Sequence, residues 1–183
     1  CLVGSEMCIR DSPNIKESQA NKALVDAVSD MEGVAVFNLY ELSQEIAFNI
    51  DEWSKIISDA SAVIYQFPFY WMSAPSLLKK WQDEVFTFLS KTPAVAGKPL
   101  TVVTTTGSEY EAYRSGGRNR FTTDELLRPY QVSAIHSGMS WQTPIVVYGM
   151  GTADAGKNIA EGANLYKQRV EMLIGSSNAG NNW

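Results

Sequence analysis

Histidine and cysteine are scarce in this sequence, whose 183 residues include one histidine, His136, and two cysteines, Cys1 and Cys8. Two cysteines are too few for a disulfide scaffold, and without histidines nearby they predict no metal site. Long apolar runs are also absent, which argues against a membrane-spanning helix, since that needs about 18 or more apolar residues in a row. No basic segment precedes an apolar stretch near the start, so we expect no signal peptide.

Positive charge is limited as well. The sequence has 15 lysines and arginines against 20 aspartates and glutamates, which gives a formal net charge of −5. A protein that binds nucleic acid needs a basic stripe facing the phosphates, so we expect no nucleic-acid partner. Hydrophobic residues make up 45% of the chain, which at this length is enough to build the core of a single domain.

Residues 1–12, CLVGSEMCIRDS, show no regular spacing of apolar positions. The string resembles the translation of a DNA adapter used to prepare sequencing libraries, whose codons match Cys1 through Asp11. We therefore expect 1–12 to be a non-native, adapter-derived segment, followed by one domain over 13–174 and a mobile tail over 175–183. Both cysteines lie in the excluded segment, so any redox function would depend on a bound cofactor and not on thiol chemistry.

Beyond this segment, helical and strand patterns alternate along the chain. Helical spacing is predicted over 18–30, 51–59, 76–89, 123–137 and 153–173, and short apolar runs predict strands over 34–39, 61–67, 100–105 and 145–148. Such alternation predicts a parallel, doubly wound α/β sheet with helices on both faces. Its first, central strand would be missing or replaced by 1–12, whose charges do not suit a position buried on both faces.

The helix expected after Pro75 has a clear amphipathic pattern. Proline suits a first helical turn, and the apolar stripe that follows comprises Leu77, Leu78, Trp81, Val85 and Phe88. The opposite face carries lysines and acids four residues apart, which stabilise exposed helices.

Three loops follow predicted strands or begin a helix, at the sheet edge where α/β proteins bind ligands. Pro13–Asn21 ends at a helix N-terminus, which is either an ordinary cap or an anion site. Pro68–Ser73 carries several aromatic residues, which either pack locally or contact a flat conjugated ligand. Thr105–Gly117 combines a strand end with two tyrosines and Gly107, where the backbone can approach a ligand closely.

Four motifs in these regions give a specific resemblance. They are SxxN at 18–21, FPFYWMSAPSLLKKWQDEVF at 67–86, TTTG at 104–107 and NRFTTDELLRPYQ at 119–131. Together they resemble the flavodoxin-like NAD(P)H:quinone oxidoreductases, the family of DT-diaphorase. The similarity is greatest to the bacterial branch that contains ancillary proteins of glutathione-gated potassium efflux systems, and it covers residues 13 to about 173.

This resemblance implies a flavodoxin-like three-layer α/β/α sandwich with a parallel sheet of order 2-1-3-4-5. It implies a homodimer that holds FMN or FAD non-covalently and transfers hydride from NAD(P)H through flavin N5 to a quinone or similar electrophile, by a ping-pong mechanism. An alternative is a flavin-holding regulatory subunit of a potassium-efflux transporter. The expected location is the cytoplasm, either free or peripheral at the inner face of the membrane.

The resemblance also assigns site residues. The flavin phosphate would be held by Ser18, Gln19, Ala20 and Asn21. The isoalloxazine ring would be lined by Phe69, Tyr70, Trp71 and Met72. The pyrimidine edge would be bound by Thr105, Thr106, Gly107 and Ser108. Tyr113 would be catalytic, with its phenol donating a hydrogen bond as negative charge develops on the flavin.

Two departures from the family pattern bear on this assignment. The histidine that partners the catalytic tyrosine in DT-diaphorase aligns with Asn119, so a proton relay would be incomplete. His136 lies in a predicted helix beyond NRFTTDELLRPYQ and is expected to be structural. The stretch before Gly97 is also shortened, to TFLSKTPAVA, which alters one wall of the substrate site.

Overall fold

The computed structural model describes residues 5–10, 19–42 and 47–179. Within them, one parallel sheet has the strand order β2-β1-β3-β4-β5, and β6 also pairs with β4. The strands are β1 (Ser5–Arg10), β2 (Val34–Asn38), β3 (Ala60–Pro68), β4 (Pro99–Thr105), β5 (Ser140–Trp141) and β6 (Ile145–Val147). Because β5 and β6 pair with successive parts of β4, together they act as the fifth strand. The predicted order 2-1-3-4-5 is therefore confirmed.

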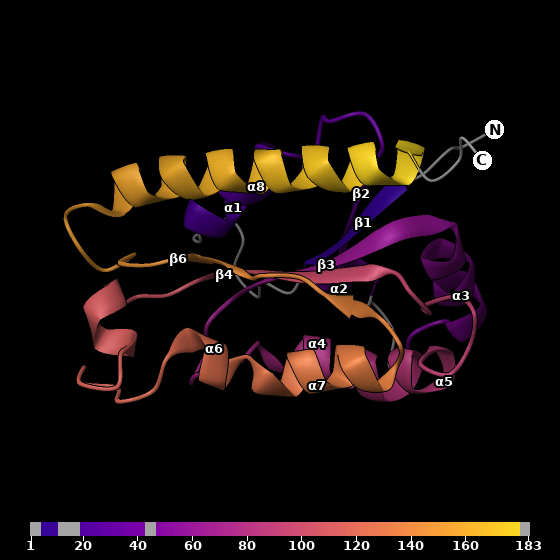
Figure 1. Ribbon diagram of the computed structural model, residues 1–183, viewed down its shortest axis with the longest axis horizontal. Helices are drawn as coiled ribbons and strands as arrows, with labels where there is room; N and C mark the ends of the chain where they lie inside the picture. Colours follow the sequence, from indigo (N-terminus) through magenta and orange to yellow (C-terminus); the bar gives the residue numbers. More distant parts are fainter. Residues whose placement is uncertain (1–4, 11–18, 43–46, 180–183) are drawn as a thin grey trace.

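Helices cover both faces of this sheet (Figure 1). One face carries α1 (Gln19–Asp26) and α8 (Ala155–Ala179). The other face carries α2 (Leu39–Leu42), α3 (Ile50–Asp59), α4 (Ser76–Trp81), the π-helical turn η1 (Gln82–Phe86), α5 (Thr87–Leu89), α6 (Thr123–Leu126) and α7 (Arg128–His136). A short 3-10 helix, η2 (Tyr110–Tyr113), follows the end of β4. The result is the expected three-layer α/β/α sandwich.

The sheet separates two hydrophobic cores. Beneath α1 and α8 the core is mainly aliphatic and includes Leu24, Val28 and Val170, with Tyr166 as its one fully buried aromatic ring among the described residues. On the opposite face the core is rich in aromatic rings, and the indoles of Trp53 and Trp81 meet edge to face with their centroids 5.3 Å apart. Because successive strand residues point to opposite faces, the apolar runs of β3 and β4 supply both cores at once.

The central strand of the sheet comes from the segment that is expected to be non-native. Residues 5–10 form β1 between β2 and β3, with Cys8 opposite Val36 on one side and Ile64 on the other. Of the two predicted alternatives, a first strand that is missing or one that is replaced by 1–12, the structure has the second. That the charges of this segment weaken the fold stays a prediction. Cys8 and Ile9 are fully buried, one toward each core. Arg10 lies at the end of the strand, where its guanidinium is 3.9 Å from the Glu41 carboxylate.

The predicted helix over 76–89 is interrupted by the π-helical turn η1. Leu78, Trp81 and Val85 face the core as predicted, but Phe88 is 61% exposed. Phe86 and Leu89 are buried in its place, since a π-helical turn is wider than an α-helical one and changes which residues face inward.

Two other helices differ at their boundaries. The predicted helix over 123–137 is divided into α6 and α7, and α6 begins with a capping box between Thr122 and Glu125. The last helix, expected to end near residue 173, extends to Ala179, so the first part of the expected tail is helical. Among the described helices, none combines the length and apolar character that crossing a membrane requires.

Candidate functional site

A cavity of about 470 Å³ lies at the carboxyl ends of the central strands. Its walls come from the start of α1, the ends of β3 and β4, and the start of α8, which begins at this end of the sheet (Figure 1). The residues around it are Gln19, Ala20, Pro68, Phe69, Tyr70, Thr105, Thr106, Gly107, Met150, Ala155 and Ile159. Each of the three loops singled out in the sequence therefore contributes to one cavity.

The first loop contributes Gln19 and Ala20, whereas Asn21 has another position. The Asn21 side chain is 1% exposed, and its Nδ2 donates a 3.0 Å hydrogen bond to Oγ1 of Thr105. Its backbone carbonyl accepts a second hydrogen bond, from Nε2 of buried Gln66. Asn21 thus joins α1 to β3 and β4 instead of lining the cavity. Ser18, predicted beside it, lies outside the described residues.

Two residues of the aromatic loop line the cavity, and the two at its tip do not. Phe69 and Tyr70 line the cavity, and the Phe69 amide donates to the Thr105 carbonyl at 2.9 Å. Trp71 and Met72 form the tip of a tight turn with φ values of 48° and 65°, closed by backbone hydrogen bonds between Tyr70 and Ser73. Trp71 is 96% exposed, so neither side chain at the tip lines the cavity.

This turn is held from below by α7. The Tyr130 hydroxyl lies 3.1 Å from Oγ of Ser73 and accepts a 3.0 Å hydrogen bond from the Ala74 amide. Positive φ at two successive residues is unusual for residues other than glycine, and such strain persists only where the surroundings fix it. The two hydrogen bonds to Tyr130 supply that constraint.

The third loop brings backbone to the cavity. Thr105, Thr106 and Gly107 line it, and a Cβ built on Gly107 would meet no atom within 4 Å. Ser108 is not among the lining residues, and its Oγ accepts a 2.5 Å hydrogen bond from the exposed Arg118 guanidinium. The predicted pyrimidine-edge residues therefore divide into three that line the cavity and one that supports the loop.

Tyr113 is not among the residues that line the cavity, but it contacts one of them. It is 5% exposed, and its ring centroid is 6.2 Å from that of Phe69, which does line the cavity. Asn119 donates its backbone N–H to the Ala112 carbonyl at 3.0 Å, which brings residue 119 back beside η2. His136 is exposed on α7 and lines a separate groove with residues of α4, η1 and α5.

Sequence reasoning missed the wall contributed by Met150, Ala155 and Ile159. The loop after β6 is hydrogen-bonded to the third loop, with the Met150 amide donating to the Thr106 carbonyl at 2.9 Å. The Gly151 amide likewise donates to the Gly107 carbonyl at 2.9 Å. The signal was present in the sequence, since Gly-Met-Gly follows a predicted strand whose carboxyl end must reach the same edge of the sheet.

Two helix N-termini meet at the cavity, and both favour an anionic ligand. α1 contributes Gln19 and Ala20, and α8 contributes Ala155 and Ile159. Neither helix has an acidic residue in its described first turn, although Asp154 directly precedes α8. Among the described residues, no cluster of three or more histidine, cysteine, aspartate or glutamate side chains is suited to a metal ion.

Comparison with known proteins identifies the family. The sequence profile of the family described as Flavodoxin-like fold matches residues 7–170. The chain belongs to the flavodoxin-like fold family. The match begins within β1 and ends within α8, so it spans the whole sheet and the cavity at its edge.

Curated members of this flavodoxin-like family include close relatives of the chain. The Uncharacterized NAD(P)H oxidoreductase YdeQ of Bacillus subtilis (strain 168) is 35% identical over 165 residues, which are 88% of this chain and 83% of the relative. The Glutathione-regulated potassium-efflux system ancillary protein KefG of Serratia proteamaculans (strain 568) is 35% identical over 140 residues, 74% of this chain and 76% of the relative.

Solved structures of this fold agree closely with the chain. General stress protein 14 of Treponema denticola, in complex with FMN, has a TM-score of 0.82 and 27% identity, covering 92% of this chain and 99% of that one. A protein described as an NADPH-quinone reductase from P. pentosaceus has a TM-score of 0.75 and 25% identity, covering 88% of this chain and 97% of that one. These relatives agree with the resemblance drawn from the sequence motifs.

Proposed function

We propose that this chain is a flavin-dependent NAD(P)H:quinone oxidoreductase that works by a ping-pong mechanism. The observation that carries the proposal is the single cavity formed by all three loops at the carboxyl edge of the sheet. Relatives named for NAD(P)H oxidoreductase and NADPH-quinone reductase activity support it. FMN is the favoured cofactor, because a structural relative at 27% identity is in complex with FMN.

The described residues fit a flavin. Ligand cavities of this class measure roughly 300–1,000 Å³, and this one measures about 470 Å³. The open space beside Gly107 is where a side chain would otherwise intrude, so the backbone there can approach a flat ring system. Phe69 offers an apolar wall, and the N-termini of α1 and α8 offer N–H groups to an anionic phosphate.

A bound flavin would supply the hydride chemistry, accepting two electrons from NAD(P)H and passing them to a quinone or similar electrophile. The residues of the chain would bind and orient the flavin and stabilise the charge that develops on it. We assign the backbone of Thr105, Thr106 and Gly107 to the polar edge of the ring, and Gln19 and Ala20 to the phosphate. By the family resemblance, we assign Tyr113 as a hydrogen-bond donor that stabilises negative charge developing on the flavin, which requires its hydroxyl to reach the ring past Phe69.

Ping-pong turnover requires that NAD(P)H and the quinone use the same space in succession. The cavity at the carboxyl ends of β3 and β4 provides such a space. We also propose that a second copy of the chain covers the turn at Trp71 and Met72, since Trp71 is almost fully exposed there. In a homodimer the aromatic tip would complete the partner's substrate site or be covered by it.

A second function is supported by one observation, the 35% identity to a potassium-efflux ancillary protein. In this alternative the chain holds flavin as a regulatory subunit of a transporter, and turnover is secondary. Rapid NAD(P)H oxidation by the isolated chain would favour the enzyme. Slow oxidation that is unchanged by quinones, together with co-purification with a membrane transporter, would favour the regulatory subunit.

The test begins with the absorption spectrum of the purified chain and identification of the released flavin by chromatography. The expected result is a flavin spectrum, reduction by NADPH or NADH under anaerobic conditions, and reoxidation by benzoquinone. Initial rates at several quinone concentrations should give parallel double-reciprocal lines. A chain that takes up neither FMN nor FAD would contradict both the enzymatic and the regulatory proposal.

A further inference from the structure

Tyr148 follows the end of β6 and contacts both tyrosines of the 3-10 helix η2. Its ring centroid is 5.3 Å from that of Tyr110, with the planes at 80°, and 5.9 Å from that of Tyr113, at 50°. Edge-to-face and tilted contacts at these separations are the favourable arrangements of aromatic pairs. Tyr148 is itself half-buried, so it lies between η2 and the body of the protein.

The two contacts follow from the geometry of η2. A 3-10 helix has three residues per turn, so side chains at positions i and i+3 eclipse each other. Tyr110 and Tyr113 are three apart, which places both rings on one face of the helix, and that face meets Tyr148. No side chain caps the start of η2, and the helix has only four residues. Its packing against Tyr148 is therefore one of the contacts that position it, beside the hydrogen bond from the Asn119 amide to the Ala112 carbonyl.

Tyr148 is in turn fixed by two other helices. Its hydroxyl lies 2.6 Å from the Oγ1 of Thr123, the first residue of α6. Its backbone carbonyl accepts a 2.9 Å hydrogen bond from Nδ2 of Asn158, in α8. Burial raises the pKa of Tyr148 above its usual value, against the opposing effect of the hydrogen bond to Thr123. The hydroxyl therefore stays protonated at neutral pH and the bond persists.

We propose that Tyr148 is a positioning residue, which holds Tyr113 beside Phe69 at the cavity wall and is itself held by Thr123. The chain of contacts runs from the Thr123 hydroxyl to the Tyr148 ring, from there to Tyr113, and from Tyr113 to Phe69. The catalytic consequence rests on the proposed function, because it assumes that Tyr113 acts on a reaction in the cavity. The structural consequence, a fixed Tyr113 ring, does not depend on that function.

Three variants separate the ring of Tyr148 from its hydroxyl. Tyr148→Phe keeps the ring and removes the hydroxyl, Thr123→Val removes the hydrogen-bond partner of that hydroxyl, and Tyr148→Leu removes both the ring contacts and the hydrogen bond.

For Tyr148→Phe and Thr123→Val we expect kcat to fall about fivefold, the size of one hydrogen bond's net contribution. Combining them should add little, since both break the same bond. Tyr148→Leu should lower kcat further, to a value close to that of Tyr113→Phe. In all of them the KM for NAD(P)H and the Kd for FMN should stay within about twofold of wild type, because none of these side chains lines the cavity.

A second readout does not depend on turnover. In protein labelled with 13C in its tyrosine rings, the Tyr113 signal is assigned by its loss in Tyr113→Phe and recorded with and without FMN. We expect it to shift or broaden in Thr123→Val and in Tyr148→Leu, because a ring released from its contact samples more positions. Tyr148→Phe should change it less than Tyr148→Leu, since the ring contact is kept.

Thr122→Val is the matched control. Thr122 caps α6 through the Glu125 amide but takes no part in the bond to Tyr148. Thr122→Val should lower the free energy of unfolding by removing the cap, while leaving kcat and the Tyr113 signal unchanged. If Thr122→Val reproduced the effects of Thr123→Val, the cause would be the stability of α6, and the positioning role would be wrong. An unshifted Tyr113 signal in Tyr148→Leu would overturn it as well. If wild type showed the expected tyrosine signals but no NAD(P)H oxidation, the proposed function would fail and the positioning of Tyr113 would stand.

Discussion

The Asn21 side chain donates a 3.0 Å hydrogen bond to the Thr105 hydroxyl, which joins the first turn of α1 to the end of β4. Both residues are buried, so the bond is made away from water. Two of the three loops around the cavity are therefore fastened to each other by side chains, and the shape of the cavity depends on that connection.

Replacing Asn21 with alanine should destabilise the fold by about 1–3 kcal/mol, because it removes the bond and leaves the buried Thr105 hydroxyl without this partner. Urea unfolding measures the loss. The exposed neighbour Lys22, which pairs with Asp26 on the helix surface, is the control, and Lys22→Ala should change stability by less than about 0.5 kcal/mol. Unchanged stability with lost FMN binding in Asn21→Ala would show that Asn21 contacts the phosphate directly.

Gly107→Val should weaken FMN binding about tenfold or more while leaving the fold intact. A Cβ at Gly107 enters open space beside the cavity, so the added methyl groups occupy the ligand's position and not that of a protein neighbour. A tenfold loss corresponds to ~1.4 kcal/mol and is measured by fluorescence titration with FMN. Gly116→Val, in the exposed loop after η2, likewise meets no atom and should bind FMN as wild type does. Wild-type affinity in Gly107→Val would place the flavin elsewhere.

Gly162→Ala should destabilise the protein by about 1–3 kcal/mol through overpacking. A Cβ at Gly162 in α8 would overlap the Val147 side chain on β6, so helix and sheet would have to separate. Gly175 in the same helix has no atom within 4 Å of an added Cβ. Gly175→Ala should therefore stabilise by up to about 1 kcal/mol, since alanine favours a helix more than glycine does. Equal shifts of the two urea midpoints would contradict close packing at Gly162.

Stability should fall as the pH rises from 9 to 11, in part because of Cys8. Burial raises the pKa of its thiol from 9.0 to about 11, although a hydrogen bond with the Tyr166 hydroxyl works against that rise. Between these values the unfolded chain has lost the thiol proton and the folded chain keeps it, so unfolding becomes more favourable, by about 2 kcal/mol over the window. Urea unfolding of wild type and Cys8→Ala at several pH values isolates this contribution. Equal slopes in the two proteins would refute it.

The sequence predicted the sheet and the edge at which the cavity forms, because alternating apolar patterns and strand ends depend on local spacing. It did not predict which side chains turn inward at that edge. Asn21 and Ser108 are polar residues beside a site, and only tertiary contacts decide that their side chains bond to protein. Trp71 and Met72 sit in an αL turn, a backbone state that their residue types do not signal.

The central strand and the π-helical turn could not be predicted from the sequence for a different reason. Met7, Cys8 and Ile9 form an apolar run too short to indicate a strand by itself, and the segment becomes a strand through pairing with β2 and β3 on both sides. The π-helical turn over Gln82–Phe86 contains no residue type that signals it, yet it determines that Phe86 faces the core and Phe88 faces solvent. Both features arise from long-range packing, which local patterns do not encode.

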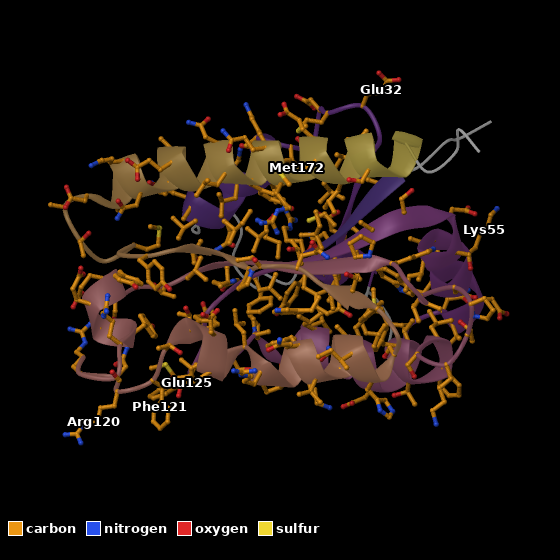
Figure 2. The ribbon with its side chains drawn as sticks, viewed as in Figure 1. Glu32, Lys55, Arg120, Phe121, Glu125 and Met172 are labelled. Carbon is orange, nitrogen blue, oxygen red and sulfur yellow. The ribbon has the colours of Figure 1, made fainter. Side chains whose placement is uncertain are left out.

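The 25-residue helix α8 begins at the cavity with Ala155 and runs the length of the sheet to Ala179 (Figures 1 and 2). At 1.5 Å per residue it extends about 37 Å. A dye or surface linker joined to an exposed position in its last turns, such as Ser176→Cys, would therefore sit at the opposite end of the molecule from the cavity. Anchored there, the protein would present its cavity to solution, which suits it to surface-based measurement of ligand binding.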